Sequence, residues 1–460
     1  MNEDATPLED FIRGKDEFDL DPLTLPVSLA GSSEWDMMDP ERRNRILGGM
    51  LRHTVARAKA HVPLYQRNVL WQAVHPEEIV DVSDLEQLPI ISKDSLPGTG
   101  SPSQTGIKGF RAEALEDPHV LIPDNLGELL NIQEASNPNH SDIFAKYRGR
   151  VVMEFGSGGS TGKSTITKLT YLTVETEAHA LARCLHMNGF QKRQSIACFY
   201  APEHKGGWQL ERAADIMGMA FHSKERIFSE LKVDRRYSTA IIGFQTGQEI
   251  LKREDATDED RAKALAMMIE HSPLVRDGIR NYIQRHGIHV IESVQPSSEF
   301  MSKNTKGGSL AFMTIYDEDP RAFGSVEHVF LTGFPVPTSA YERLRADGMR
   351  VSTTWGSTEM MALATSQPKV SVNDLIATPF PTVGQVVWYR EREHETPRCV
   401  PPPCGLEGVL LVTSLLGAGS LYLNYMIGDI ATKTERGYCD IHRLSSADIA
   451  GSCAADALSV

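Results

Sequence analysis

A glycine-rich loop lies at residues 155–164, where the sequence reads FGSGGSTGKS. The apolar segment Val151–Phe155 leads into it, and the alternating, β-branched segment Ile166–Leu172 follows it. Such a loop can turn backbone N–H groups and hydroxyls toward one point, and a lysine adds a positive charge. A flexible surface hairpin has the same flanks. The density of glycine, hydroxyl and lysine nevertheless favours a site for a phosphate chain.

Two kinds of phosphate loop compete for this stretch. A Walker A loop has the pattern G-x-x-x-x-G-K-[ST], but its first glycine falls on Ser157. That loop also runs into a helix, whereas the segment after Ser164 alternates like a strand. A Walker B aspartate should end a second apolar strand, and the best candidate, Thr239–Phe244, is followed by glutamine. A P-loop kinase or NTPase is therefore the second interpretation.

The first interpretation is the phosphate loop of the adenylate-forming enzymes, with the pattern S-S/T-G-T/S-T/S-G-K. The loop resembles this pattern closely, although Ser164 stands where that family usually has proline. The resemblance implies that the loop holds the phosphates of ATP and that Lys163 is catalytic. The phosphate-binding residues expected from it are Ser157, Gly158, Gly159, Ser160, Thr161, Gly162 and Lys163.

Three later segments resemble motifs of the same superfamily and come in the expected order. Trp355–Glu359 resembles Y-G-x-T-E, in which the aromatic ring packs on adenine, the threonine meets the α-phosphate and the glutamate holds Mg²⁺. Asn424–Asp429 resembles Y-R-T-G-D, whose aspartate binds the ribose hydroxyls, and Leu331–Pro337 resembles the adenine-side loop. Thr358 and Glu359 are thereby implied as catalytic, with Glu359 as the metal ligand. The implied nucleotide-binding residues are Gly333, Phe334, Pro335, Trp355, Gly356, Ser357, Thr358 and Asp429.

Within the superfamily, the chain looks most like the phenylacetate–CoA ligase branch. His61–Gln66 and Asp84–Asp94 resemble two early segments of that branch, and Tyr200–Gly207 takes the place of its acyl-pocket segment. The resemblance covers roughly residues 45–445. It implies an aromatic carboxylic acid as substrate, and the expected substrate-binding residues are Tyr200, His204, Gly206 and Gly207.

The end of the chain departs from the family pattern. Family members continue past the ribose-binding aspartate into a hinge and a small C-terminal domain, which carries a lysine for adenylation and surfaces for CoA. No such hinge is recognisable after Asp429, although Arg443 is expected to take the place of the ribose-contacting arginine. We therefore expect a helical region at 1–100, an adenylate-forming α/β domain at 101–445 and a tail at 446–460. A piece of a longer protein is the alternative.

Composition narrows the remaining possibilities. The chain has 460 residues, of which 41% are hydrophobic and 23% charged, and its formal net charge is −14. A protein that binds the phosphate backbone is normally basic, so nucleic acid is not expected as a partner. The acidic N-terminus has no apolar signal segment. Residues 408–428 lack charged side chains, but glycine and polar residues interrupt them, so we expect no membrane span and a cytoplasmic protein.

Cysteine content gives little indication of a metal or disulfide scaffold. Six cysteines in a chain of 460 residues are typical of reduced thiols. Cys399, Cys404, Cys439 and His442 could supply four zinc ligands. Three prolines stiffen the segment between the first two of these cysteines, so Zn²⁺ is not expected.

The order of apolar segments predicts an α/β fold with largely parallel strands. Asp39 should cap a helix over Arg42–Ala60. The segment 385–403 is expected to be a surface loop, and 436–460 to hold neither helix nor strand. Strands are expected at Ser195–Tyr200, Thr239–Phe244, Ile288–Glu292, Ser309–Tyr316 and His328–Thr332, and helices at Glu259–Glu270, Leu274–His286 and Ser339–Ala346.

These observations predict the large N-terminal domain of an adenylate-forming enzyme, with stacked sheets flanked by helices and no recognisable C-terminal lid domain. Its reaction would join a small carboxylic acid to AMP and release pyrophosphate, with ATP and Mg²⁺. The acyl group would then pass to an acceptor protein or downstream enzyme, as in short relatives from antibiotic biosynthesis. Use of CoA and a homodimer stay open. The alternatives are a complete acyl-CoA ligase, a P-loop kinase or NTPase, and a nucleotide-binding relative with weak catalysis.

Overall fold

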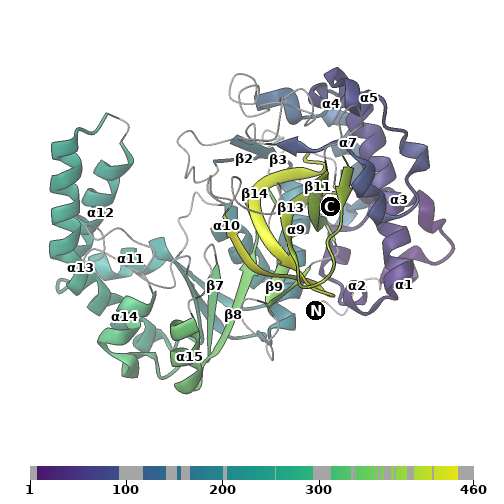
Figure 1. Cartoon of the computed structure of the whole chain (residues 1–460). Coiled ribbons are helices and arrows are strands. Elements are labelled where there is room, and N and C mark those ends of the chain that lie inside the picture. Colours follow the sequence, from purple (N-terminus) through teal and green to yellow (C-terminus); the bar gives the residue numbers. More distant parts are fainter. Residues whose placement is uncertain are drawn as a thin grey trace. The chain divides into compact units, whose positions relative to one another are not determined.

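The structure is a computed structural model of the whole chain (Figure 1). Its described residues are 8–92, 118–140, 153–156, 166–199, 205–253, 255–293, 312–332, 336, 338–357, 359–360, 364–366, 374–377, 380–390, 398–416 and 419–443. They form a mixed α/β fold, which confirms the predicted fold class.

The chain forms two compact units. The first comprises Met1–Met187, Trp355–Thr365 and Asn373–Val460, and the second comprises Asn188–Thr354 and Ser366–Val372. The first unit therefore combines both ends of the sequence, while the second is built mainly from one continuous stretch. The boundaries expected at residues 100 and 445 stay a prediction.

Helices of the first unit lie mostly in its N-terminal part. The longest is α3 (Pro40–His61), where the Asp39 side chain accepts a hydrogen bond from the backbone N–H of Arg42. This confirms the predicted helix and its cap. The others are α1 (Leu8–Ile12), α2 (Glu34–Met37), α4 (Pro63–Arg67), α5 (Val69–Gln72), α7 (Leu126–Ser136), α9 (Tyr171–Met187) and the short 3-10 helices η1 (Glu17–Asp19), η2 (Pro22–Thr24), η3 (Val27–Gly31), η4 (Pro76–Glu78), η5 (Val82–Gln87), η6 (Pro118–Leu121) and η7 (Pro138–His140).

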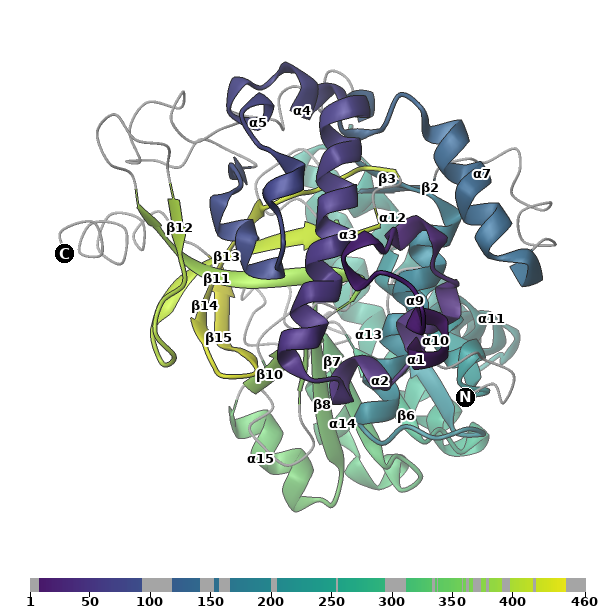
Figure 2. The same cartoon turned by 90° about the vertical axis from the view of Figure 1, so that its right-hand side faces the viewer.

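Strands of the first unit form an antiparallel series in the order β12-β11-β13-β14-β15-β10, and the short β1 pairs in parallel with β14. A separate hairpin joins β2 to β3. Figure 2 shows α3 in front of β11 and β13. The bounds are β1 (Ile91–Ser92), β2 (Met153–Gly156), β3 (Ile166–Leu169), β10 (Asp374–Ala377), β11 (Thr382–Arg390), β12 (Arg398–Val400), β13 (Glu407–Ser414), β14 (Tyr425–Lys433) and β15 (Gly437–Arg443).

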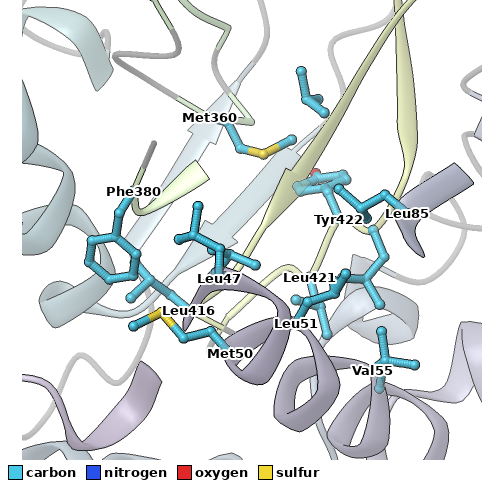
Figure 3. Close-up of a cluster of buried hydrophobic side chains, with 14 of the residues drawn as sticks. Leu47, Met50, Leu51, Val55, Leu85, Met360, Phe380, Leu416, Leu421 and Tyr422 are labelled. Carbon is cyan, nitrogen blue, oxygen red and sulfur yellow. The ribbon is translucent and has the colours of Figure 1, made fainter. Parts of the chain in front are cut away.

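A large apolar core joins α3 to the segment between β13 and β14. The Thr54 hydroxyl donates to the carbonyl oxygen of Leu415, across 361 residues of sequence, at 2.7 Å. Figure 3 shows one face of α3 among side chains from the rest of the unit. The side chains labelled there are Leu47, Met50, Leu51, Val55, Leu85, Met360, Phe380, Leu416, Leu421 and Tyr422.

The second unit contains five parallel strands in the order β8-β7-β6-β4-β5. The chain runs from β4 outward to β5 and then returns to the other side of β4 as β6. The switch point of the sheet therefore lies between β4 and β6, a common place for ligands in open parallel sheets. The strands are β4 (Ser195–Cys198), β5 (Ala220–Ser223), β6 (Val290–Ser293), β7 (His328–Thr332) and β8 (Arg350–Trp355), and a further short strand, β9 (Ala364–Ser366), spans a unit boundary.

Helices of the second unit connect these strands and correct two predictions. Thr239–Phe244, expected to be a strand, belongs to α12, and the described part of 309–316 begins α14. Buried side chains follow helical spacing from the N-cap Tyr237 through Ala240, Ile241 and Phe244 of α12, while Ile242 is 52% exposed. The bounds are α10 (Lys205–Ile216), α11 (Lys224–Val233), α12 (Ser238–Lys252), α13 (Asp258–His286), α14 (Phe312–Glu318), η10 (Pro320–Phe323) and α15 (Thr338–Ala346).

Three further expectations were wrong. The two helices predicted on either side of Pro273 are the single helix α13, because packing of Val275, Ile279 and Ile283 outweighs the hydrogen bond that proline removes. The expected loop at 385–403 contains most of β11 and all of β12, and the expected irregular end contains β15. The predicted β7 and α15 are confirmed. No helix in the described ranges has the length and apolar character needed to cross a membrane.

Candidate functional site

The glycine-rich loop closes the hairpin of β2 and β3. Gly156 and Ile166 are paired at its last register position, so residues 157–165 connect two antiparallel strands. A Walker A loop leads into a helix, whereas here the chain continues as β3 and reaches α9 only at Tyr171. This disfavours the P-loop interpretation. The expected phosphate-binding residues, Ser157 to Lys163, lie outside the described residues.

The strand that leaves the loop is tied to the segment before β14. The backbone N–H of Lys168 donates to the Ser420 hydroxyl at 2.9 Å, and Ser420 N–H donates back to the Lys168 carbonyl. Leu169 also forms an isolated bridge with Gly419. Gly419 has a φ of +86°, and a Cβ there would lie 2.6 Å from the Lys168 carbonyl oxygen. Glycine is thus required for this close approach.

A buried tyrosine extends this connection. The hydroxyls of Thr167 and Tyr422 share a hydrogen bond of 2.9 Å, and both side chains are fully buried. The rings of Tyr422 and Tyr425 are tilted against each other, with centroids 5.0 Å apart. Burial, with a smaller contribution from the charge of Glu359, raises the pKa of Tyr422 far above its usual value. Its hydroxyl therefore stays protonated and available for hydrogen bonding.

Glu359 is the carboxylate at the end of this series. The Tyr425 hydroxyl donates to Glu359 Oε1 at 3.3 Å, and the glutamate is only 5% exposed. A tight backbone arrangement holds it, since Ser357 N–H donates to the Met360 carbonyl at 2.7 Å. Met360 anchors the arrangement in the core that also contains Tyr422 (Figure 3). The structure thus brings Glu359 to Tyr422 and Thr167 although they are far apart in sequence.

The donor set at Glu359 suits a hard cation. Mg²⁺ prefers oxygen ligands and usually takes one or two carboxylates together with phosphate oxygens. Glu359 offers such a carboxylate within the unit that also holds the base of the glycine-rich hairpin. Among the described residues, no group of three or more His, Cys, Asp or Glu side chains could hold a metal by itself. A cation at Glu359 would therefore need further oxygens from a ligand. The expectation that Cys399, Cys404, Cys439 and His442 do not bind zinc stays a prediction.

Asp429, the expected ribose ligand, lies in an irregular part of β14. It is 6% exposed, and its register partner on β15 is Arg443, the arginine predicted to accompany it. The pairing of β13 with β14 slips here, because Val409 faces Ile430 but Leu411 faces Met426. Extra residues in β14 therefore form a bulge, a feature that often redirects side chains near sites. The ribose role itself stays a prediction.

Some of the other expected site residues lie among the described residues, and the rest lie outside them. Trp355 ends β8, and Gly356 follows it and leads to Ser357. The Trp355 side chain is partly buried and packs against the core of the first unit. Gly206 and Gly207 lie buried in the first turn of α10. Outside the described residues lie Tyr200, His204, Gly333, Phe334, Pro335 and Thr358.

Sequence reasoning missed a buried carboxylate in the second unit. Glu292 is fully buried at the carboxyl end of β6, beside the switch point. Its Oε1 accepts a hydrogen bond from the Thr332 hydroxyl at 2.9 Å, and its Oε2 accepts from Cys198 Sγ at 3.2 Å. The signal was present, because Glu292 is a charged residue at the end of an otherwise apolar strand and buried charges are rare without partners.

Comparison with solved structures identifies the fold. Neither a family model nor a curated protein sequence matches the chain. An open conformation of 2-hydroxyisobutyryl-CoA ligase in complex with 2-HIB-AMP and CoA matches with a TM-score of 0.56 and 14% identity, over 89% of this chain and 75% of that chain. The same ligase in its thioesterification state matches with a TM-score of 0.58 and 15% identity, over 90% and 70%.

This chain has the fold of the adenylate-forming enzymes. The fold predicted from the four motifs is therefore confirmed. A sequence identity of 14% to 15% supports a shared fold and nothing beyond it. The expectation of a missing C-terminal domain stays a prediction.

Proposed function

We propose that this chain activates a carboxylic acid by transferring AMP to it from ATP. One observation carries the proposal, namely the connected set Thr167, Tyr422, Tyr425 and Glu359. It joins the glycine-rich hairpin, the W-G-S-T-E segment and the start of the N-Y-M-I-G-D segment within one unit. A set of unrelated surface motifs would have no reason to converge in this way.

The reaction that fits these residues is a displacement at phosphorus. A carboxylate oxygen forms a bond to the α-phosphorus, the bond from that phosphorus to the α,β-bridging oxygen breaks, and pyrophosphate leaves. No general base is needed, since a carboxylic acid is already ionised near pH 7. Charge on the phosphate oxygens is stabilised by donors placed in advance, which is the role proposed for Lys163, Thr358 and the backbone of the loop.

The remaining residues have proposed binding roles. Glu359 would hold Mg²⁺, which when bound neutralises phosphate charge. Asp429 would accept hydrogen bonds from the ribose hydroxyls, with Arg443 as its neighbour in the register. Trp355 would offer a ring face to adenine. Met426 and Ile427, which replace polar residues of the related motif, are buried and so serve the core.

The acid and its acceptor are finer parts of the proposal. We propose an aromatic acid, bound with the help of Tyr200, His204, Gly206 and Gly207. The matching structure of 2-hydroxyisobutyryl-CoA ligase is a complex with 2-HIB-AMP and CoA. This supports a thiol as one acceptor. A carrier protein or a downstream enzyme is the other. Both are tested by supplying the acceptor after adenylation.

The decisive experiment is exchange of labelled pyrophosphate into ATP in the presence of a panel of carboxylic acids. Exchange that depends on one acid is the expected result. Formation of ADP would indicate a kinase or NTPase, and binding of ATP without exchange for any acid would indicate a nucleotide-binding protein. Either result would contradict the proposal.

A matched pair of variants tests the role of Glu359. Glu359→Gln removes the charge but keeps the size, and it should abolish Mg²⁺-dependent exchange. Glu435→Gln changes an exposed glutamate between β14 and β15 and should leave exchange unchanged. If the two variants behave alike with the accepted acid, Glu359 is not the metal ligand.

A further inference from the structure

Asn424 has an unusual backbone conformation directly before β14. Its φ is +50°, in the left-handed region, and the residue is fully buried. Asparagine adopts this conformation more readily than most residues, but the conformation still costs free energy that the surrounding contacts have to offset. A buried residue held in this way indicates a constraint on the local backbone.

The side chain of Asn424 has a partner for each of its polar atoms. Nδ2 donates to the carbonyl oxygens of Leu88 at 2.8 Å and Leu85 at 3.3 Å, at the end of η5. Oδ1 accepts from Gln385 Nε2 of β11 at 2.8 Å. These partners call for an asparagine, because aspartate would set a carboxylate oxygen against the two carbonyls. Glycine would adopt the same φ but make none of these bonds.

The backbone of Asn424 is bonded as well. Its N–H donates to the Thr413 hydroxyl of β13 at 2.8 Å, and its carbonyl oxygen accepts from the Ile91 N–H of β1 at 3.1 Å. The next residue, Tyr425, pairs with Ile91 on one side and with Val412 on the other. The start of β14 is thus fixed against β1, β11, β13 and the end of η5, all within the first unit.

The register of β14 needs a local constraint of this kind, because its pairing with β13 is interrupted. Residues 409–411 of β13 face residues 426–430 of β14, so the chain advances two residues in one strand and four in the other. Asp429 lies in this irregular part. The later half of β14 therefore does not set the register of the first half. A slip by one residue would turn the side chains of the first half to the opposite face.

Two candidate site residues depend on this register. Tyr425 directly follows Asn424, and its hydroxyl donates to Glu359 Oε1 at 3.3 Å. Asp429 follows four residues later. We propose that Asn424 is a positioning residue, which fixes the register of β14 and thereby places Tyr425 against Glu359 and Asp429 in its irregular segment. The inference rests on the proposed function, which assigns Mg²⁺ to Glu359 and the ribose to Asp429.

A double-mutant cycle tests the positioning role without using the reaction. Asn424→Gly removes three side-chain hydrogen bonds but tolerates the positive φ, so it should fold. Glu359→Gln removes the charge from the acceptor of the Tyr425 hydroxyl. In urea unfolding, the double variant should lose less stability than the sum of the two single losses, because both changes act through Tyr425. In a Tyr425→Phe background this coupling should disappear.

Asn137 supplies the matched control. It is also a buried asparagine of the first unit, 4% exposed. Its Oδ1 accepts from the Val27 N–H at 2.8 Å, and its Nδ2 donates to the Gln133 carbonyl at 2.8 Å. Both partners lie outside β14 and outside the segment that holds Glu359. The losses of Asn137→Gly and Glu359→Gln should therefore be additive.

Nucleotide binding and exchange give a second readout, which a loss of stability alone would not move. Asn424→Gly should weaken binding of ATP with Mg²⁺ in calorimetry, and lower pyrophosphate exchange, each by about tenfold or more, since a displacement of about 1 Å can cost about a hundredfold in rate. Gln385→Met removes only one of the three bonds and should have a smaller effect. Asn137→Gly should leave both quantities unchanged, even where it lowers stability as much.

The outcomes separate this inference from the proposed function. Additive losses for Asn424→Gly and Glu359→Gln overturn it, and so does unchanged ATP affinity in Asn424→Gly when the parent binds ATP. Coupling in the cycle, together with no exchange by the parent for any acid, would support the positioning role and contradict the adenylation. If Asn424→Gly does not fold, Gln385→Met takes its place in the cycle, and additive losses there overturn the inference.

Discussion

The hydrogen bond between Thr167 and Tyr422 should carry a measurable part of the stability of the first unit. Tyr422→Phe would leave the buried Thr167 hydroxyl without the partner now 2.9 Å away. An unsatisfied buried hydroxyl costs about 1–3 kcal/mol. Thr167→Val should have a smaller cost, because the Tyr422 hydroxyl also contacts Ser420. The double variant should lose less than the sum, with a coupling of about 0.5–1.5 kcal/mol.

Urea unfolding followed by circular dichroism gives the four free energies of this cycle. Tyr438→Phe is the matched control, because that tyrosine is buried in the same unit but its hydroxyl has no hydrogen-bond partner among the described residues. Its free energy of unfolding should stay within about 0.5 kcal/mol of the parent or rise. Strict additivity in the cycle, or an equal loss in Tyr438→Phe, would refute the reasoning.

Further predictions concern the ribose, the close backbone contact and the buried histidines. Asp429→Ala should weaken ATP binding by roughly tenfold or more in calorimetry, because two charge-assisted hydrogen bonds are lost; an unchanged affinity would place the ribose elsewhere. Gly419→Ala should lower the urea midpoint, since its Cβ would meet the Lys168 carbonyl oxygen at 2.6 Å; a fully stable variant would contradict that contact. Burial lowers the pKa of His328 to about 3 and that of His222 to about 4. The two neutral rings therefore make their full contribution to the free energy of unfolding above pH 6.5, and this contribution is lost as the pH falls toward those values. Unfolding midpoints measured across this range should fall with pH, and less so in His328→Gln.

The local sequence was sufficient to predict an element where signals within that element determine its conformation. Asp39 and Pro40 mark the start of α3, and the buried side chains of that helix follow its period. The apolar run His328–Thr332 is a strand because short β-rich runs between loops fit a buried parallel sheet. The four motifs were also readable in order, and the comparison with solved structures confirms the fold that they implied.

Sequence alone misassigned segments whose conformation depends on a distant partner. Thr239–Phe244 is β-branched like a strand, but its apolar side chains also fit a helical face, and packing against α13 selects the helix. Residues 385–390 looked like part of a polar loop, yet 385–387 pair with β13 and 388–390 pair with β12. Local propensity differs little between such alternatives, so the free energy of tertiary burial decides between them.

The candidate site shows the same division between sequence and tertiary structure. Glu359 and Asp429 could be named from motifs, since their types and neighbours are local properties of the sequence. The link from Thr167 through Tyr422 to Tyr425 could not, because its first hydrogen bond spans 255 residues. The burial of His328 was equally hidden, whereas Glu292 left a local signal as a charged residue at the end of an apolar strand. A side chain's burial and partners depend on which distant strands lie beside it, and only the folded chain sets that arrangement.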